Sequence, residues 1–140
     1  MKLSVAILLL FISLAGKAQN TKTEIRNFML QGEQTWNEGD LDAFMKTYWN
    51  HDSVALIGKR GVTRGWQQIN DVYKKGFPDT SYMGHLRYDI IEIKVFSPQY
   101  EYVIGKFNVT RTKGDFSGYF DVLVRKIKGK WYIIADHSSS

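Results

Sequence analysis

The stretch that decides the fold runs Phe116-Ser-Gly-Tyr-Phe-Asp-Val-Leu-Val-Arg-Lys-Ile-Lys-Gly-Lys-Trp-Tyr-Ile-Ile-Ala-Asp-His-Ser138. Two runs rich in Val, Ile, Tyr and Phe flank Lys128-Gly129. An X-Gly pair between two such runs is a hairpin signal, because Gly accepts a positive φ. A two-residue turn here places Ile127 opposite Lys130. The stretch therefore predicts a long β-hairpin at the end of the chain.

Counting back from that two-residue turn places two carboxylates, Asp121 and Asp136, opposite each other, whereas a turn one residue longer would set Asp121 against His137 and move Asp136 to the other face. The preceding hairpin, with a turn at Lys113-Gly114, puts Lys106 opposite Asp121. Like charges that face each other across a strand pair repel, so this row predicts solvent, a cation or a functional use. The neighbouring row of the same face holds Asn108, Tyr119 and Ser138.

Length and composition support one compact domain, since the chain has 140 residues of which 44% are apolar and 14% aromatic. Residues 1–18 combine a basic start, an apolar run and small residues, as in a secretory signal peptide. The apolar run is shorter than the roughly 20 residues that a membrane-spanning helix needs. We predict cleavage after Ala18, a mature domain over residues 19–140, and a secreted or periplasmic location without a membrane anchor.

The absence of cysteine and the distribution of charge exclude several kinds of site and partner. The chain contains no Cys, which excludes a disulfide, a thiolate metal site and a lipid-modified cysteine. The formal net charge is +5, and two of the basic residues, Lys2 and Lys17, belong to the predicted signal peptide. The remaining Lys and Arg residues are scattered rather than gathered in a stripe with aromatics. Nucleic acid is therefore not an expected partner.

Apolar residues recur at helical spacing in three segments, residues 21–38, 41–48 and 66–77. Gly39 ends the first predicted helix and Asp40 caps the second. The rest of the chain reads as a short strand over residues 53–58, a loop over residues 59–65, and four long strands. These strands cover residues 86–96, 100–112, 116–127 and 131–138. Three helices followed by an antiparallel sheet predict an α+β fold with the helices on one face of the sheet.

Three parts of the chain resemble the nuclear transport factor 2-like superfamily: residues 36–52 around Gly39-Asp40, the helix start at Gly65-Trp66, and the ending over residues 129–138. More closely, they resemble its exported bacterial members of unknown function, near the SnoaL-like polyketide cyclases and ketosteroid isomerases. The resemblance implies a cone-shaped curved antiparallel sheet whose concave face carries the three helices. That superfamily hosts isomerases, cyclases, dehydratases, hydrolases and binding domains, so it implies a pocket rather than one reaction.

The ketosteroid isomerases imply that the polar face of the sheet lines the pocket, with Asp121 as the carboxylic acid of an oxyanion hole. Gly32 stands where that family has a Tyr, and Leu56 or Ile57 where it has the general-base Asp, which disfavours steroid isomerisation. Alternation alone equally allows the apolar face to be the core and the polar face to be solvated. The residues expected to bind ligand are Lys106, Asn108, Tyr119, Asp121, Asp136, Tyr48 and Trp49.

Few residue patterns in the sequence indicate a metal site or an anion site. His51, His85 and His137 do not share a ligand spacing such as His-x-x-x-His, so no metal site is expected, and no cofactor is implied. Arg60 and Arg64 lie in the predicted loop before a helix start, a place where proteins can bind an anion. The simpler interpretation is that both arginines are exposed to solvent.

Three functions stay open on the sequence. The first is an exported domain that binds a small, partly apolar molecule. The second is a cofactor-independent lyase, isomerase or hydrolase that uses Asp121 and Asp136 as paired acid and base, with no catalytic residue assigned beyond that pair. The third is a protein-interaction module.

A homodimer is also predicted, because one sheet face carries more apolar side chains than a soluble monomer usually exposes, provided that the helices cover the other face. These side chains are Phe107, Val109, Phe120, Val122, Val124, Ile133 and Ala135.

Overall fold

The structure is a computed structural model that describes residues 2–140, with side chains described from residue 15 onward. The predicted signal peptide falls largely on residues 1–14, whose side chains lie outside that part, and it stays a prediction. Among the described residues, no helix combines the length and apolarity needed to cross a membrane.

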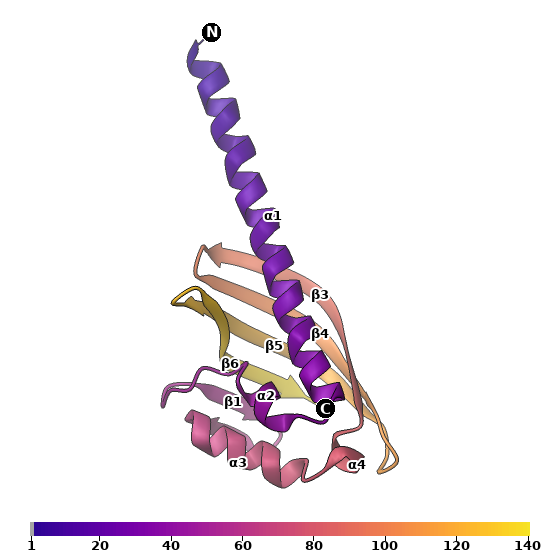
Figure 1. Cartoon of the computed structure of the whole chain (residues 1–140). Coiled ribbons are helices and arrows are strands. Elements are labelled where there is room, and N and C mark those ends of the chain that lie inside the picture. The colour runs from indigo at the N-terminus through magenta and orange to yellow at the C-terminus, as the bar shows by residue number, and fades with distance from the viewer. Residues whose placement is uncertain (1) are drawn as a thin grey trace.

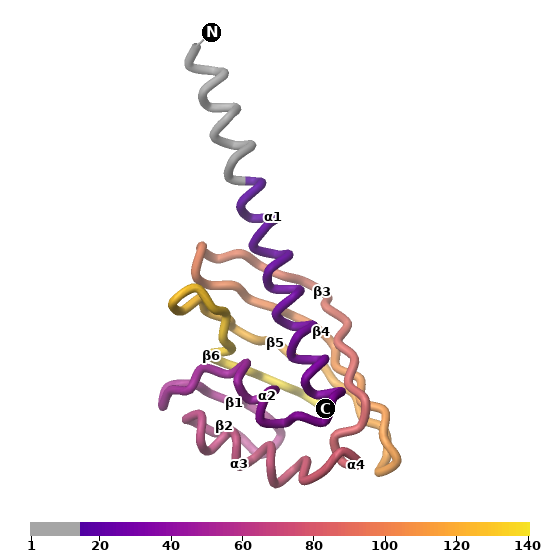
Figure 2. The backbone as a smooth tube through the Cα atoms, in the orientation of Figure 1, coloured from indigo at the N-terminus to yellow at the C-terminus, as the bar shows by residue number. Residues whose placement is uncertain are grey.

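The described residues, 2–140, form four helices and six strands. The helices are α1 (Lys2–Asn37), α2 (Leu41–Met45), α3 (Trp66–Gly76) and α4 (Thr80–Met83). The strands are β1 (Ala55–Gly58), β2 (Gly61–Arg64), β3 (His85–Ser97), β4 (Tyr100–Thr110), β5 (Phe116–Ile127) and β6 (Lys130–Ser139). They form one curved sheet in the order β2-β1-β6-β5-β4-β3, and α1 crosses its concave face (Figures 1 and 2). The predicted α+β fold with a cone-shaped sheet is confirmed.

Local sequence explains the helices and the first turn. Asp40 caps α2, because its side chain accepts a hydrogen bond from the Ala43 backbone N–H at 2.8 Å. Gly39 precedes it with φ +75°, a conformation that favours glycine. On α1, the predicted stripe is buried at Ile25, Met29 and Trp36. This stripe anchors the helix to the sheet.

Two features of the first strands differ from the prediction. The segment expected to be a loop over residues 59–65 folds back on β1 as β2, with Gly58 opposite Gly61. Gly61 has φ +102°, which lets the chain reverse through Lys59-Arg60 alone. Strand β1 also pairs with β6 in parallel, so the sheet is mixed rather than antiparallel throughout. The chain leaving α2 runs alongside β6, beginning with the parallel bridge between Tyr48 and Ile133.

The turn at Lys128-Gly129 is confirmed, since Ile127 faces Lys130 as counted from the sequence. Farther along the hairpin, a β-bulge lies between the pairs Val124↔Ile133 and Leu123↔Ala135. A one-residue shift moves every later side chain of that strand to the other face.

The bulge overturns the predicted carboxylate pair. Asp121 faces His137 and Asp136 faces Val122, so the two carboxylates lie on opposite faces of the sheet. The prediction of an Asp121–Asp136 pair was wrong, because the bulge interrupts the strand between the turn and these residues.

The preceding hairpin also differs in register. Lys106 faces Tyr119 instead of Asp121, because residues 111–115 together form the loop. Arg111 holds this wider loop by donating from its backbone N–H to Asp115 Oδ1 and from Nε to the Gly114 carbonyl, both at 2.9 Å. A two-residue shift keeps each side chain on its predicted face.

The apolar face of the sheet is the core beneath α1. All the apolar side chains counted for a dimer contact lie there, except Ala135, which the bulge moves to the outer face, opposite Leu123. The sequence's other interpretation therefore holds, with the apolar face under the helices. The homodimer was predicted because this apolar face was expected to be exposed. That argument no longer applies, and the homodimer remains a prediction without it.

Candidate functional site

A cavity of about 600 Å³ lies between the concave face of the sheet and the helices. This volume is within the range of pockets that enclose drug-sized ligands. Most of its wall is apolar, and much of that is aromatic. The apolar residues that line it include Met29, Trp36, Phe44, Leu86, Phe107, Val109, Phe116, Phe120, Val122 and Ile133.

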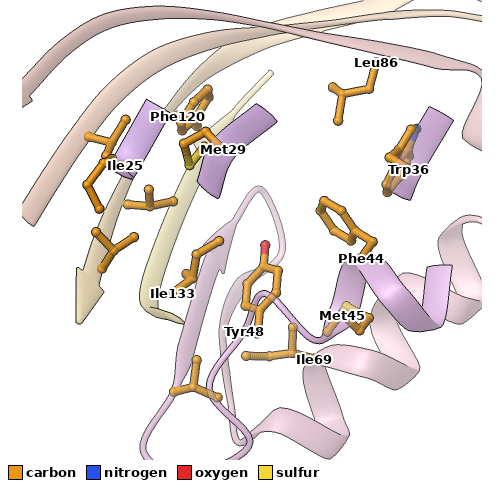
Figure 3. Close-up of a cluster of buried hydrophobic side chains, with 14 of the residues drawn as sticks. Ile25, Met29, Trp36, Phe44, Met45, Tyr48, Ile69, Leu86, Phe120 and Ile133 are labelled. Carbon is orange, nitrogen blue, oxygen red and sulfur yellow. The ribbon is translucent and has the colours of Figure 1, made fainter. Parts of the chain in front are cut away.

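One chain of polar groups interrupts the apolar wall. The Tyr48 hydroxyl donates to Asp136 Oδ2 at 2.5 Å and lies 2.8 Å from the Tyr73 hydroxyl. Ser138 Oγ donates to the other carboxylate oxygen, Oδ1, at 3.0 Å. Figure 3 shows the Tyr48 hydroxyl directed away from Met45, into the space between helices and sheet. Tyr48, Tyr73, Asp136 and Ser138 all line the cavity.

A second tyrosine hydroxyl is available to a ligand. Tyr88 of β3 lines the cavity, and its ring packs on Phe120 with centroids 5.1 Å apart. Its backbone N–H donates to Glu33, whereas its hydroxyl has no partner among residues 15–140. Tyr88 can therefore donate a hydrogen bond into the cavity without breaking one inside the protein.

Burial controls the protonation of these groups. It raises the pKa of Asp136 above its usual range, although the hydrogen bonds from Tyr48 and Ser138 act in the opposite direction. Burial likewise raises the pKa of Tyr48, Tyr73 and Tyr88, so all three phenols stay protonated. The cavity thus offers hydroxyl groups, together with a carboxyl group that takes up a proton more readily than an exposed Asp does.

Local structure explains why these groups meet. The β-bulge in β6 turns Asp136 inward, and the bridge from Tyr48 to Ile133 fixes Tyr48 beside the same strand. Tyr73 approaches from α3, on the helical face that also buries Ile69. Helix, loop and strand therefore converge on one carboxylate.

Of the predicted ligand-binding residues, the structure brings Tyr48 and Asp136 to the cavity. Trp49 points elsewhere, with its ring stacked on His51 at a centroid distance of 4.0 Å. Lys106, Asn108, Tyr119 and Asp121 lie on the outer face of the sheet, so the prediction that this polar face lines the pocket was wrong.

The outer face forms its own hydrogen bonds. Asp121 accepts from the Tyr102 hydroxyl at 2.8 Å and lies 2.9 Å from His137 Nδ1. Asn108 donates to Asp89 Oδ2 at 2.9 Å. These contacts are mostly exposed, and they leave Asp121 no route to the cavity.

Sequence reasoning missed Tyr73 and Tyr88 as site residues. Tyr73 was counted only as part of the apolar stripe of a helix, and Tyr88 only as part of a strand. Their shared signal is a tyrosine at an inward position, which places a hydroxyl inside the core. Among the described residues, no group of three or more His, Asp or Glu side chains is arranged to hold a metal ion.

Comparison with known proteins identifies the family. A nuclear transport factor 2-like protein of unknown function from Shewanella oneidensis shares 37% sequence identity, with a TM-score of 0.82 over 86% of this chain and 99% of that one. The chain belongs to the nuclear transport factor 2-like superfamily. No family model matches it, and a search of curated proteins found no match.

More distant nuclear transport factor 2-like structures share the fold alone. A protein of unknown function from Pseudomonas putida is 14% identical with a TM-score of 0.68, and each chain is covered over 87%. A ketosteroid isomerase-like protein from Erwinia carotovora is 22% identical with a TM-score of 0.63, over 82% of this chain and 92% of that one. Membership of the superfamily thus accounts for the fold, and the activity must be argued from the cavity itself.

Proposed function

We propose that this nuclear transport factor 2-like domain binds a small, largely apolar molecule in the cavity, after the export that its predicted signal peptide implies. The observation that carries the proposal is the Tyr73–Tyr48–Asp136 chain in an apolar wall. Burial of a carboxylate costs free energy, and the packing of an apolar core does not require a carboxylate. A ligand's polar atom has two places to bind. One is the free hydroxyl of Tyr88, and the other is the hydroxyl of Tyr73, the last group in this series of hydrogen bonds.

Binding is favoured over catalysis by the groups that the cavity lacks. With Asp121 on the outer face, Asp136 lacks the partner that the paired-carboxylate mechanism needs. The other aspartate of the cavity lining, Asp71, is exposed and accepts a hydrogen bond from Gln67. Leu56 lines the cavity at a position where the ketosteroid isomerase resemblance implies the general base. The paired-carboxylate mechanism is therefore withdrawn, and no catalytic residue is assigned.

A variant that fills the cavity tests the proposal. Val122 lines the cavity opposite Asp136 and is 2% exposed. We expect Val122→Trp to lower the affinity for the neutral fluorescent probe phenylnaphthylamine by at least about tenfold, because the indole would take up space that the probe needs. Fluorescence titration measures the affinity, and mass spectrometry of organic extracts from both purified proteins shows whether a co-purified compound is lost as well.

The neighbouring residue supplies the control. Leu123→Trp adds the same indole on the opposite sheet face and should leave the affinity within about twofold, since that face does not contact the cavity. Both variants must retain cooperative thermal unfolding. Equal binding by wild type and Val122→Trp, or no binding by the wild type, would contradict a ligand site in this cavity.

A further inference from the structure

The opening of the cavity is basic, in contrast to its apolar interior. Among the exposed residues that line the cavity, Lys59 and Arg60 come from the β1–β2 turn and Lys75 from the last turn of α3. Asp71, also on α3, is the exposed acidic side chain in this lining. Positive side chains therefore outnumber acidic ones around the opening.

These cations are not used to stabilise the described fold. Within residues 15–140, none of Lys59, Arg60 and Lys75 forms an ion pair. The adjacent Lys74 does pair, with Asp42 at 3.1 Å, and points away from the cavity lining. Asp71 accepts a hydrogen bond from Gln67 Nε2 at 2.9 Å and forms no ion pair with these cations within residues 15–140, so the side chains of the opening keep an excess of positive charge. The three cations remain free to meet an anion.

The backbone fixes where two of these charges lie. Gly58 faces Gly61, so Lys59 and Arg60 form the tip of a tight hairpin. Strand β1 is tied to β6 at Leu56, which pairs with Asp136. The tip is thereby held in register with the strand that carries the cavity's carboxylate, which lets one ligand reach both ends of the site.

We propose that the natural ligand is an amphipathic anion. Its apolar, ring-containing body lies in the cavity, and its carboxylate, sulfonate or phosphate group lies at the opening against Lys59, Arg60 and Lys75. This inference rests on the proposed function of the cavity. Aromatic walls at Trp36 and Phe107 suit a ring system, and exposed cations attract an anion without the cost of burying it.

Two fluorescent probes with the same ring system test the charge separately from the cavity. Anilinonaphthalene sulfonate carries a negative group, whereas phenylnaphthylamine is the neutral analogue. We expect the wild type to bind the sulfonate more tightly than the neutral probe, with an affinity that falls as salt screens the opening. In Lys59→Gln/Arg60→Gln, the sulfonate affinity should fall about fivefold to tenfold while the neutral probe binds as before.

A matched variant controls for net charge. Lys94→Gln/Lys128→Gln removes two positive charges from β3 and the β5–β6 turn, outside the cavity lining. It should leave the ratio of the two affinities unchanged. The ratio is the decisive quantity, because damage to the cavity would weaken both probes together.

The outcomes separate this inference from the proposed function. Equal affinity for the two probes, or a sulfonate affinity that survives loss of Lys59 and Arg60, would overturn the anionic ligand while leaving the cavity as a binding site. Failure of both probes to bind the wild type would instead reject the binding function. Selective loss of the sulfonate in the opening variant, with the control unaffected, is the result expected.

Discussion

Replacement of Glu101 by glutamine is expected to stabilise the domain by about 2–3 kcal/mol at pH 8 and by much less at pH 5. Glu101 lies on β4, where it is 0% exposed, and both of its carboxylate oxygens are buried without a hydrogen-bond partner among residues 15–140. Burial raises its pKa to about 7, although the positive charge of Lys22 acts in the opposite direction. The ionised form is therefore the costly one.

The sign of the pH dependence follows from that shift. The folded state holds a proton on Glu101 up to about pH 7, whereas the unfolded chain releases it near its ordinary pKa of about 4.3. Folding therefore binds a proton in this interval, and Glu101 costs increasing stability as the pH rises from about 4.3 to 7. Glutamine has the same shape and no charge, so it removes this cost.

Urea denaturation of wild type and Glu101→Gln at both pH values measures the difference. Glu92→Gln, an exposed change on the adjacent strand β3, is the control and should alter stability by less than about 0.5 kcal/mol at either pH. The same stabilisation at pH 5 as at pH 8 would mean that packing, rather than ionisation, distinguishes the Glu101 variant.

Hydrophobic periodicity and turn residues predict much of this fold. The stripe of Ile25, Met29 and Trp36, the cap at Asp40 and the turn at Lys128-Gly129 each rest on local chemistry, and each is confirmed. The β-bulge in β6 was not predictable in this way, because no Gly marks it and it turns the polar Asp136 and Ser138 inward, where uninterrupted alternation places Ala135. The loop over residues 111–115 depends on side-chain contacts of Arg111, which a count of turn residues does not contain.

The location of the site was harder to infer than the fold. Alternation shows that one sheet face is polar and the other apolar, but it does not show which face the helices cover. The apolar stripe of α1 was the available signal, since it needs an apolar surface such as Val122 and Val124 to bury against. The ketosteroid isomerase resemblance favoured the polar face instead. Asp136 reached the cavity only through the bulge.

The polar chain in the cavity supports the second large effect. Tyr48→Phe is expected to destabilise the domain by about 2–3 kcal/mol at pH 8, because hydrogen bonds to charged groups contribute about that much and Asp136 would keep only Ser138. The Tyr48 hydrogen bond lowers the pKa of Asp136, so its removal should raise that pKa further. Denaturation measures the first effect, and a carboxyl NMR titration of Asp136 measures the second.

Tyr102→Phe is the matched control. Its hydroxyl also donates to an aspartate, Asp121, but on the outer face where water can replace it. We expect a cost below about 1 kcal/mol there. The free-energy cost of Tyr48→Phe should also become smaller on acidification. The Tyr48 hydrogen bond favours the ionised form of Asp136, so it contributes less once the carboxyl group takes up a proton. Equal costs for the two tyrosines would show that burial does not strengthen the Tyr48 contact.

Replacing both Tyr48 and Asp136 tests whether the pair is needed for folding or is available for ligand binding. In Tyr48→Phe/Asp136→Leu, no buried charge is left unpaired, and replacing both members of a buried polar pair by apolar groups is often nearly neutral or stabilising. We expect the double variant to unfold within about 1 kcal/mol of the wild type, in contrast to Tyr48→Phe alone. A domain that folds as well without the pair does not need it for folding, so the pair would then be available for a ligand. A double variant as unstable as Tyr48→Phe would instead make Tyr48 and Asp136 structural.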